Sequence, residues 1–283
     1  MHLTTIAAIA GAGTAVGLGA YAMLYEQFAL QVKELDLTFP NLPRAFDGYT
    51  LLHISDLHLT KLGLLERRTM EIISKREVDG CVVTGDVTAK PRASDIFRRI
   101  CSAIPHRDPI LMVLGNSEHK PWLDPNVLVE ALSFQGLHML NNSSTTITRG
   151  SDSIAVVGVD DAYSRRSDFG AALKGVDPSS FVLFLTHSPC VTREAIEGGA
   201  DLILSGHTHG GQVRLPGIGL IWTHMRRNQG LNDGLYRASD IARITGADAG
   251  DSVLFVNRGI GTSRLHIRFL CRPEIVYITL HRG

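Results

Sequence analysis

The sequence predicts an α/β fold in which stacked β-sheets are covered on the outside by helices. Three observations predict it. Short apolar runs bounded by Gly or Asp recur along the chain after an uncharged N-terminal segment. Helical patterns lie between several of these runs, an alternation that is typical of α/β proteins. With 283 residues, 44% of them hydrophobic, the chain holds enough apolar material for the core of one large domain, or two at most.

The N-terminal segment from Leu3 to Tyr25 contains no charged residue. As a helix that rises about 1.5 Å per residue, it is long enough to cross the ~30 Å hydrocarbon core of a membrane. Three interpretations compete: a membrane anchor, which we favour, a cleaved signal peptide, and a buried helix of the main domain. The string AYA (Ala20 to Ala22) suits signal cleavage, but only His2 and the α-amino group precede the apolar run. We therefore predict an anchor or signal segment over residues 1–30 and one main domain over residues 31–283.

The individual elements follow from local patterns. Apolar runs bounded by turn residues predict buried strands, and amphipathic stretches predict helices. The strands are expected at Tyr49 to Ser55, Gly80 to Gly85, Pro109 to Gly115, Ser153 to Val159, Phe181 to His187, Ala200 to Gly206, Ser252 to Gly259 and Glu274 to Leu280. The helices are expected at Leu64 to Arg76, Ala93 to Ala103, Asn126 to Phe134 and Thr192 to Glu197. No helical pattern separates the last two strands, so the C-terminal part is expected to be rich in β-structure.

Charge and cysteine content argue against a nucleic-acid-binding protein and against a disulfide-rich or zinc-finger protein. The chain carries 28 basic and 28 acidic side chains without a cluster of Lys or Arg, so a nucleic-acid partner is not expected. Its four cysteines, Cys81, Cys101, Cys190 and Cys271, are far apart and have neither disulfide-framework nor zinc-finger spacing. We expect them to be core residues.

Potential metal ligands follow the apolar runs in successive strand and turn units. Taken singly, an Asp at a strand end is usually a turn or capping residue, and a lone His is usually a hydrogen-bonded core residue. The joint pattern indicates a metal site, because buried carboxylates without a cation are costly and neutral imidazoles bind divalent metals. Nitrogen and oxygen donors without Cys suit two borderline metals that share a bridging carboxylate. The residues are Asp56, His58, Asp86, Asn116, His187, His207 and His209.

The strings SDLH, GD, GN, TH and GHTH, in this order, resemble the calcineurin-like metallophosphoesterases. The resemblance extends from Leu35 to the end of the chain. The stretches Gly206 to Gly219 and Asn257 to Leu280, with VGVDD (Val157 to Asp161), are similar to a bacterial branch of membrane-associated phosphodiesterases. The resemblance implies a four-layer αββα sandwich, which the uncharged N-terminal segment is expected to precede as an apolar helix. Some enzymes that resemble this branch hydrolyse UDP-2,3-diacylglucosamine in lipid A synthesis, which is our hypothesis for the substrate.

Carried over by position, the resemblance implies a site for two divalent ions, which could be Mn, Fe or Zn. It assigns Asp56, His58 and His209 to the first ion, Asn116, His187 and His207 to the second, and Asp86 to both. Two such ions about 3.5 to 4 Å apart generate hydroxide from a shared water near neutral pH and stabilise phosphoryl charge. The expected reaction is hydrolysis of a phosphoester or pyrophosphate bond, with Asp86 and Asn116 as catalytic residues.

One position departs from the family pattern. Members usually carry His directly after the motif Asn, near the leaving group, whereas this chain has Ser117 there, in the string GNSEH. A Ser hydroxyl holds its proton too tightly to act as a general acid at neutral pH. Either His119 reaches in as the catalytic acid, or the leaving group needs no proton, which favours pyrophosphates and activated diesters. The expected substrate contacts are Ser117, Asp161 at a strand end and Arg258 beside the glycine loop GIG.

The sequence thus predicts a phosphodiesterase or nucleotide-sugar pyrophosphatase that acts on a phosphate-containing small molecule or a lipid-linked nucleotide. Its N-terminal segment predicts association with the inner (cytoplasmic) membrane, with the catalytic domain in the cytoplasm, although the flanking charges are too balanced to fix the orientation. Two alternatives stay open. One is a broad-range phosphodiesterase exported to the periplasm or cell surface, and the other is a metal-binding module without turnover.

Overall fold

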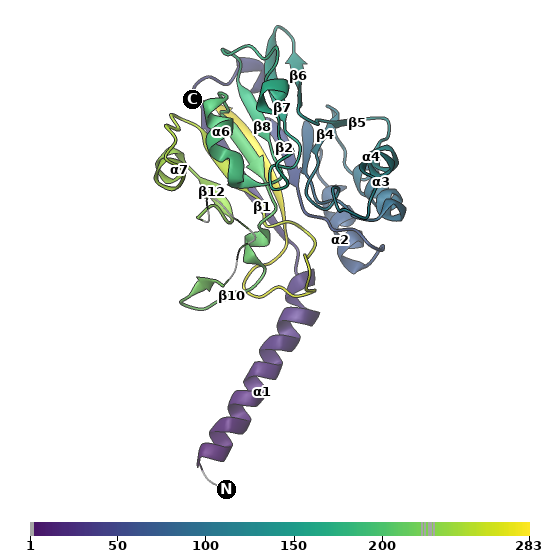
Figure 1. Cartoon of the computed structure of the whole chain (residues 1–283), viewed down its shortest axis with the longest axis vertical. Helices are drawn as coiled ribbons and strands as arrows, with labels where there is room; N and C mark the ends of the chain where they lie inside the picture. The colour runs from purple at the N-terminus through teal and green to yellow at the C-terminus, as the bar shows by residue number, and fades with distance from the viewer. Residues whose placement is uncertain (1–2, 222, 224, 226–227, 229) are drawn as a thin grey trace.

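Two six-stranded sheets pack face to face in the computed structural model, which describes residues 3–221, 223, 225, 228 and 230–283 (Figure 1). The first sheet has the order β1 (Gln31–Phe39), β14 (Glu274–Arg282), β2 (Tyr49–Ile54), β3 (Gly80–Thr84), β4 (Ile110–Val113) and β5 (Leu137–Met139). Strands β2 to β5 run parallel, β14 runs antiparallel to β2, and β1 runs parallel to β14. The carboxyl ends of β2, β3 and β4 therefore share one edge.

The second sheet is also mainly parallel. Its order is β12 (Gly234–Tyr236), β13 (Val253–Val256), β9 (Leu202–Ser205), β8 (Val182–Leu185), β7 (Asp152–Gly158) and β6 (Ser143–Arg149). Strands β13, β9, β8 and β7 run parallel, while β12 and β6 are antiparallel to their neighbours. The predicted mixed α/β sandwich with parallel sheets is confirmed.

The two faces of each sheet bury different neighbours, because successive side chains of a strand point to opposite sides. On β2, Leu51 lies in the core between the sheets and Leu52 in the core under the helices; Val82 and Val83 on β3 divide in the same way. Burying one such side chain stabilises the fold by roughly 1.5–3 kcal/mol. The outer faces are covered by α2 (Leu64–Ile73), α3 (Ser94–Ser102) and α4 (Pro125–Leu132) on the first sheet, and by α5 (Phe169–Ala172), α6 (Thr192–Glu197) and α7 (Ala238–Thr245) on the second (Figure 1).

The apolar runs expected to be strands all form strands, with ends that agree to within a few residues. Four strands were missed, and these are the edge strands β1, β5, β6 and β12. Their side chains are mostly half-buried or exposed, so their sequences lack the continuous apolar runs of the central strands. A short hairpin of β10 (Arg214–Leu215) and β11 (Gly219–Leu220) was not expected either.

The N-terminal segment forms helix α1 (Leu3–Leu24), which projects away from the sandwich (Figure 1). Among the helices that the structure describes, none combines the length and the hydropathy needed to cross a membrane. The predicted membrane anchor, and with it the inner-membrane location, is therefore wrong. The prediction used the absence of charge, but most residues of α1 are Ala, Gly and Thr, whose small side chains contribute little to transfer into lipid.

Candidate metal centre

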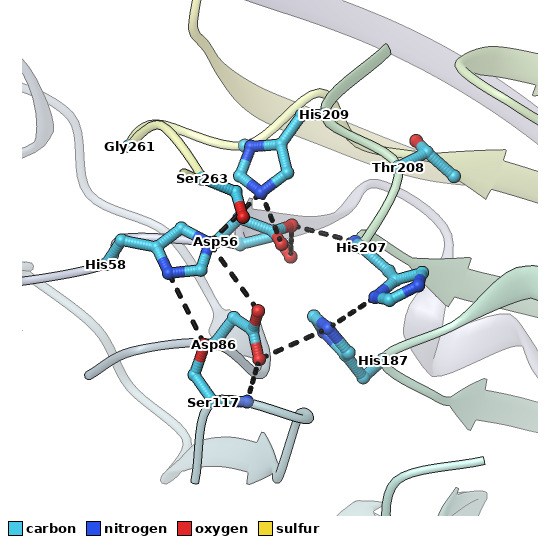
Figure 2. A network of polar contacts seen from close by, with 12 residues as sticks. Asp56, His58, Asp86, Ser117, His187, His207, Thr208, His209, Gly261 and Ser263 are labelled. Carbon is cyan, nitrogen blue, oxygen red and sulfur yellow. Dashed lines mark hydrogen bonds and ion pairs between the residues drawn. The ribbon is translucent and has the colours of Figure 1, made fainter. Parts of the chain in front are cut away.

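The predicted ligands converge where the carboxyl ends of both sheets meet. Asp56 and His58 follow β2, Asp86 follows β3 and Asn116 follows β4, all from the first sheet. His187 follows β8, and His207 and His209 follow β9, from the second sheet. Figure 2 shows the Asp and His side chains of this set pointing toward one another. The strand ends of two sheets thus bring together residues that lie up to about 150 positions apart in sequence, such as His58 and His209.

Two overlapping groups of donor atoms are close enough to hold a metal ion, with all atoms of each group within 4.8 Å of one another. One group is Asp56, His58 and His209, and the other is Asp56, Asp86 and His187. Asp56 belongs to both groups, whereas the sequence analysis assigned the shared position to Asp86.

Several of these contacts join two imidazole nitrogens, or an imidazole nitrogen and a carboxylate oxygen. Nε2 of His58 lies 3.0 Å from Nε2 of His209, and Nε2 of His187 lies 3.1 Å from Nδ1 of His207. The Nδ1 of His187 lies 2.7 Å from the carbonyl oxygen of Thr84, to which it donates its hydrogen. In the neutral ring, Nε2 is then an acceptor, although it faces Oδ1 of Asp86 at 3.3 Å. Two buried acceptors at this distance repel unless a proton or a metal ion lies between them, which is the arrangement of a metal-ligating imidazole.

The electrostatics of the buried centre favour a positive charge. Burial disfavours the charged form of His187, yet the carboxylates of Asp86 and Asp56 raise the pKa of His187 well above its usual value. Burial likewise disfavours ionised Asp86, but His187 and His58 hold the pKa of Asp86 well below its usual range. The pKa of Asp56 is raised, first by burial. The carboxylates therefore attract a cation, and a proton on His187 satisfies this demand when no metal is bound.

Two ligand oxygens have no hydrogen-bond partner among the described residues. These are Oδ1 of Asp56 and Oδ1 of Asn116, both buried. The other carboxylate oxygen of Asp56, Oδ2, accepts hydrogen bonds from Ser55 Oγ at 2.7 Å and from the backbone N–H of His207 at 2.9 Å. Because an unpaired buried oxygen costs about 1–3 kcal/mol, such atoms need a compensating ligand. The donor set fits divalent metal ions.

The backbone of the centre is strained. Five of the predicted ligands have φ in the left-handed region, which non-glycine residues rarely adopt; they are Asp56 (49°), His58 (45°), Asp86 (52°), His207 (71°) and His209 (52°). Such strain concentrates at functional sites, where the surrounding structure holds it in place. His207 and His209 follow the end of β9 instead of alternating along the strand, so their convergence depends on these turns.

A hydrogen-bonded chain from the core reaches the carboxylate of Asp56. His53 Nε2 lies 2.9 Å from Thr84 Oγ1, which donates to Ser55 Oγ at 2.8 Å, and Ser55 Oγ donates to Asp56 Oδ2 at 2.7 Å. The carboxylate can only accept, so each hydroxyl passes its hydrogen toward Asp56 and His53 supplies the first one from Nε2. The chain engages Oδ2 and leaves Oδ1 for a metal. A Cβ at Gly206 would collide with Ser55 Oγ and Asp56 Oδ2, which explains the glycine there.

Glu118 holds the turns that carry two of the predicted ligands. Its carboxylate accepts the backbone N–H groups of Gly115 at 2.8 Å, Asp86 at 3.0 Å and Thr88 at 3.1 Å. These bonds tie the turn after β3 to the turn after β4. Burial, followed by the charge of Asp86, raises the pKa of Glu118 to about 8.

A cavity of about 400 Å³ opens over the centre. It is lined by predicted ligands together with Ser117, Lys90, Lys120, Tyr163 and His266, among others. A second cavity of about 550 Å³ adjoins it and shares His58, Thr60, Thr262 and His266. The second cavity has a mixed wall, with apolar Leu57, Leu64 and Leu65 beside polar Gln27 and Lys61. Together the cavities can take a substrate with an anionic group at the centre and a larger group beside it.

Three predicted catalytic or substrate-binding residues do not line these two cavities. Nε2 of His119 lies 2.6 Å from Oδ1 of Asp160, both nearly fully buried. Asp161 is fully buried and accepts backbone hydrogen bonds from the loop that follows it. The Arg258 side chain forms an ion pair with Asp233, at 2.8 Å.

Ser117, in contrast, lines the first cavity. Its backbone N–H donates to Asp86 Oδ1 at 2.7 Å, and its hydroxyl oxygen lies 3.4 Å from Nδ1 of His58 (Figure 2). Two residues that fasten the loop of residues 258–267 beside the centre, Gln212 and Arg268, were not singled out from the sequence. Both lie in stretches that carry the family resemblance, which is the only signal that pointed toward them.

The family model for calcineurin-like phosphoesterases matches residues 49–211, which include every predicted metal ligand. The chain belongs to this family. An uncharacterized metallophosphoesterase of Bacillus subtilis, YkuE, is 29% identical over 280 residues, covering 96% of this chain and 92% of the relative. The phosphodiesterase YaeI of Escherichia coli is 25% identical over 238 residues, 82% of each chain. The UDP-2,3-diacylglucosamine pyrophosphatase LpxG of Chlamydia trachomatis is 29% identical over 174 residues, 58% of this chain but only 49% of LpxG.

These findings identify the metallophosphoesterase as a phosphoester hydrolase. The family uses divalent metal ions, and the structure provides candidate ligands for them.

Proposed function

We propose that this metallophosphoesterase hydrolyses phosphodiester or pyrophosphate bonds with two divalent metal ions. In this proposal Asp56, His58 and His209 would hold one ion and Asn116, His187 and His207 the other. Asp86, whose carboxylate faces His58 at 3.5 Å and His187 at 3.3 Å, would serve both. The observation that carries it is the buried convergence of these donors, with Oδ1 of Asp56 and of Asn116 lacking hydrogen-bond partners among the described residues. The catalytic domain comprises residues 31–283 as a four-layer αββα sandwich. Manganese, iron and zinc all suit this donor set.

The protein side chains hold and orient the reacting groups. When bound, the two ions supply a water of lowered pKa and positive charge opposite the phosphoryl oxygens. Asp86 is fixed in place by the Ser117 backbone N–H, and Asn116 adds an amide oxygen without adding charge. Lys90 and Lys120 line the cavity and attract an anionic substrate. The burial of the carboxylates excludes water from all sides except the cavity, which strengthens each electrostatic contact with the phosphoryl group.

The substrate that we favour is UDP-2,3-diacylglucosamine, the compound named for the LpxG relatives. The mixed wall of the adjoining cavity suits a molecule with polar and apolar parts. A less specific phosphodiesterase activity is the second candidate, supported by the similarity to YaeI over most of both chains.

A substrate panel tests this proposal. Protein treated with a chelator and dialysed is supplied with Mn²⁺, Fe²⁺ or Zn²⁺ and then assayed on UDP-2,3-diacylglucosamine, bis(p-nitrophenyl) phosphate and p-nitrophenyl phosphate. We expect metal-dependent cleavage of the pyrophosphate and the diester, and weaker cleavage of the monoester. If neither the pyrophosphate nor the diester is cleaved with any metal, the proposal is wrong.

Removing the Ser55 hydroxyl should weaken metal binding. Ser55→Ala breaks the hydrogen-bonded chain to Asp56 Oδ2 and lets the carboxylate rotate. We expect the affinity for Mn²⁺ to fall about 10- to 100-fold, the usual effect of losing a group that orients a metal ligand. Competition with a fluorescent chelator measures it. The matched control is Ser205→Ala, another buried strand-end serine, whose hydroxyl has no hydrogen-bond partner in the described structure; equal affinities of the two variants would refute the role of the chain.

A further inference from the structure

The basic alcohol that leaves from an unactivated phosphodiester needs a proton donor, and the usual family position does not provide one here. Ser117 occupies that position, and a hydroxyl is a poor acid at neutral pH. The nearby His119 directs Nε2 at Asp160, 2.6 Å away, and is nearly fully buried. A proton donor for an alcohol of ordinary basicity must therefore come from another part of the cavity wall.

His266 is placed for this task. Among the cavity-lining residues that the structure describes, it is the one histidine outside the predicted ligand set. His266 lines both cavities and therefore lies where they join. A substrate with its phosphoryl group at the metal centre and its leaving group in the second cavity would place the bond that breaks at this junction. Its Nδ1 lies 3.1 Å from Thr262 Oγ1. A hydroxyl can accept from the protonated ring and donate to the neutral one, so this contact suits both states of a residue that cycles between them.

The loop that carries His266 is fastened to the metal centre. The side-chain amide of Gln212 donates to the carbonyl oxygens of Leu265 at 3.3 Å and Ile267 at 3.4 Å, on either side of His266. Its Oε1 accepts the backbone N–H of Ser263. Gln212 itself follows the turn of His209. His266 is therefore held beside a predicted ligand, although its own side chain is exposed.

A buried arginine secures the base of the same loop. Arg268 is fully buried and donates to the carbonyl oxygens of Arg258 at 2.9 Å and Gly259 at 3.1 Å, and also to that of Gly261. The loop also donates directly to the ligand segment, from Gly261 N–H to the carbonyl oxygen of Asp56 at 2.7 Å. Figure 2 shows Gly261 and Ser263 beside His209.

From this geometry we infer that His266 donates the proton to the leaving oxygen of the substrate, in place of the histidine that family members usually carry at the position of Ser117. The inference rests on the proposed function. In the step, the oxygen of water forms a bond to phosphorus, and the bond from phosphorus to the leaving oxygen breaks. The leaving oxygen takes the proton from Nε2 of protonated His266. The attacking water loses its proton to solvent, and the neutral ring takes up a proton from solvent for the next cycle.

Leaving groups of different basicity test the role of His266. The p-nitrophenyl and phenyl esters of thymidine 5′-phosphate differ only in the leaving group, and p-nitrophenolate leaves readily without a proton. We expect His266→Gln to lower kcat/KM for the phenyl ester roughly 100-fold, the usual effect of a general acid, and to affect the p-nitrophenyl ester far less. His119→Gln, the matched control, should change both esters by the same factor. Adding Ser117→His to His266→Gln should restore part of the activity on the phenyl ester.

The outcomes separate the two levels of the hypothesis. If the wild-type enzyme cleaves neither these esters nor the pyrophosphate and diester of the substrate panel with any metal, the proposed function fails. If it cleaves the panel substrates but neither thymidine ester, the site does not act on alcohol leaving groups and the role of His266 is overturned. If the wild-type enzyme is active but His266→Gln slows both esters equally, His266 is not the proton donor. A loss of fold is detected by the melting temperature in chelator and by Mn²⁺ affinity. Should His266→Gln lose either property, Thr262→Val, which removes the contact to Nδ1, must show the same selective loss on the phenyl ester or the inference is overturned.

Discussion

Replacing Asp86 with Asn should abolish hydrolysis while leaving the protein folded. Oδ1 of Asp86 lies 3.3 Å from His187 Nε2 and Oδ2 lies 3.5 Å from His58 Nε2, so this carboxylate faces histidines from both sheets. Asn has the same shape and keeps an oxygen for the Ser117 N–H, but it carries no charge for a cation. We expect kcat/KM for bis(p-nitrophenyl) phosphate to fall by at least about 10²–10³-fold, the scale of losing one strong electrostatic contact to the transition state.

Three measurements distinguish a lost metal site from a lost fold. Activity is measured with saturating Mn²⁺, metal affinity by calorimetry, and the melting temperature with and without a chelator. Wild-type protein should be stabilised by Mn²⁺, because a ligand that binds the folded state raises its stability. Asp86→Asn should lose this stabilisation and keep a cooperative transition in chelator. Retention of more than roughly a tenth of the activity would show that Asp86 is not an essential ligand.

Asp79 provides the matched control. It is also a nearly buried Asp beside β3, but it precedes the strand, and its carboxylate accepts from Thr50 N–H at 2.7 Å and pairs with Arg149 at 2.8 Å. Asp79→Asn should lower stability and leave metal-dependent activity within a few-fold of wild type. If the two variants lose activity equally, a general effect on β3 explains the loss.

The position of the centre was predictable because it follows from sheet geometry. Parallel strands place their carboxyl ends at one edge, so a polar residue after each apolar run is expected near the others without any knowledge of the loops. This reasoning located Asp86 and His187 at the same site although β3 and β8 belong to different sheets. The edge strands were not predictable in the same way, because a strand that is half exposed, such as β6, has no continuous apolar run.

The direction of a side chain within a loop was not predictable. His119 is only two residues from Ser117, yet it pairs with Asp160, and no local pattern relates these two residues. Other contacts join residues that are far apart in sequence. Gln212 holds a loop more than 50 residues further along the chain, and only this contact shows that His266 lies near the site. Sequence periodicity describes which face of an element is buried, whereas these contacts depend on how two loops pack.

Glu118→Ala should cause the largest loss of stability among the variants described here. The Glu118 carboxyl group, which is 1% exposed, accepts three buried backbone N–H groups, those of Asp86, Thr88 and Gly115. Leaving a buried donor unpaired costs about 1–3 kcal/mol, and relaxation of the turns around the smaller side chain offsets part of this cost. We expect the free energy of unfolding to fall by roughly 3 kcal/mol in urea denaturation at pH 6 in the presence of a chelator.

The pH dependence of this stability loss tests whether burial controls the ionisation of Glu118. The pKa of Glu118 in the folded protein, about 8, exceeds its ordinary value of 4.5, so the folded state binds the proton more tightly than the unfolded state. The contribution of Glu118 to stability is therefore complete below pH 4.5 and is lost as the pH rises through 8. The difference between wild type and Glu118→Ala should shrink from pH 5 to pH 9, whereas Glu130→Ala, an exposed Glu on α4, should show little difference at any pH. A difference that grows with pH would mean that Glu118 is held as a stabilised carboxylate, and that burial does not dominate its environment.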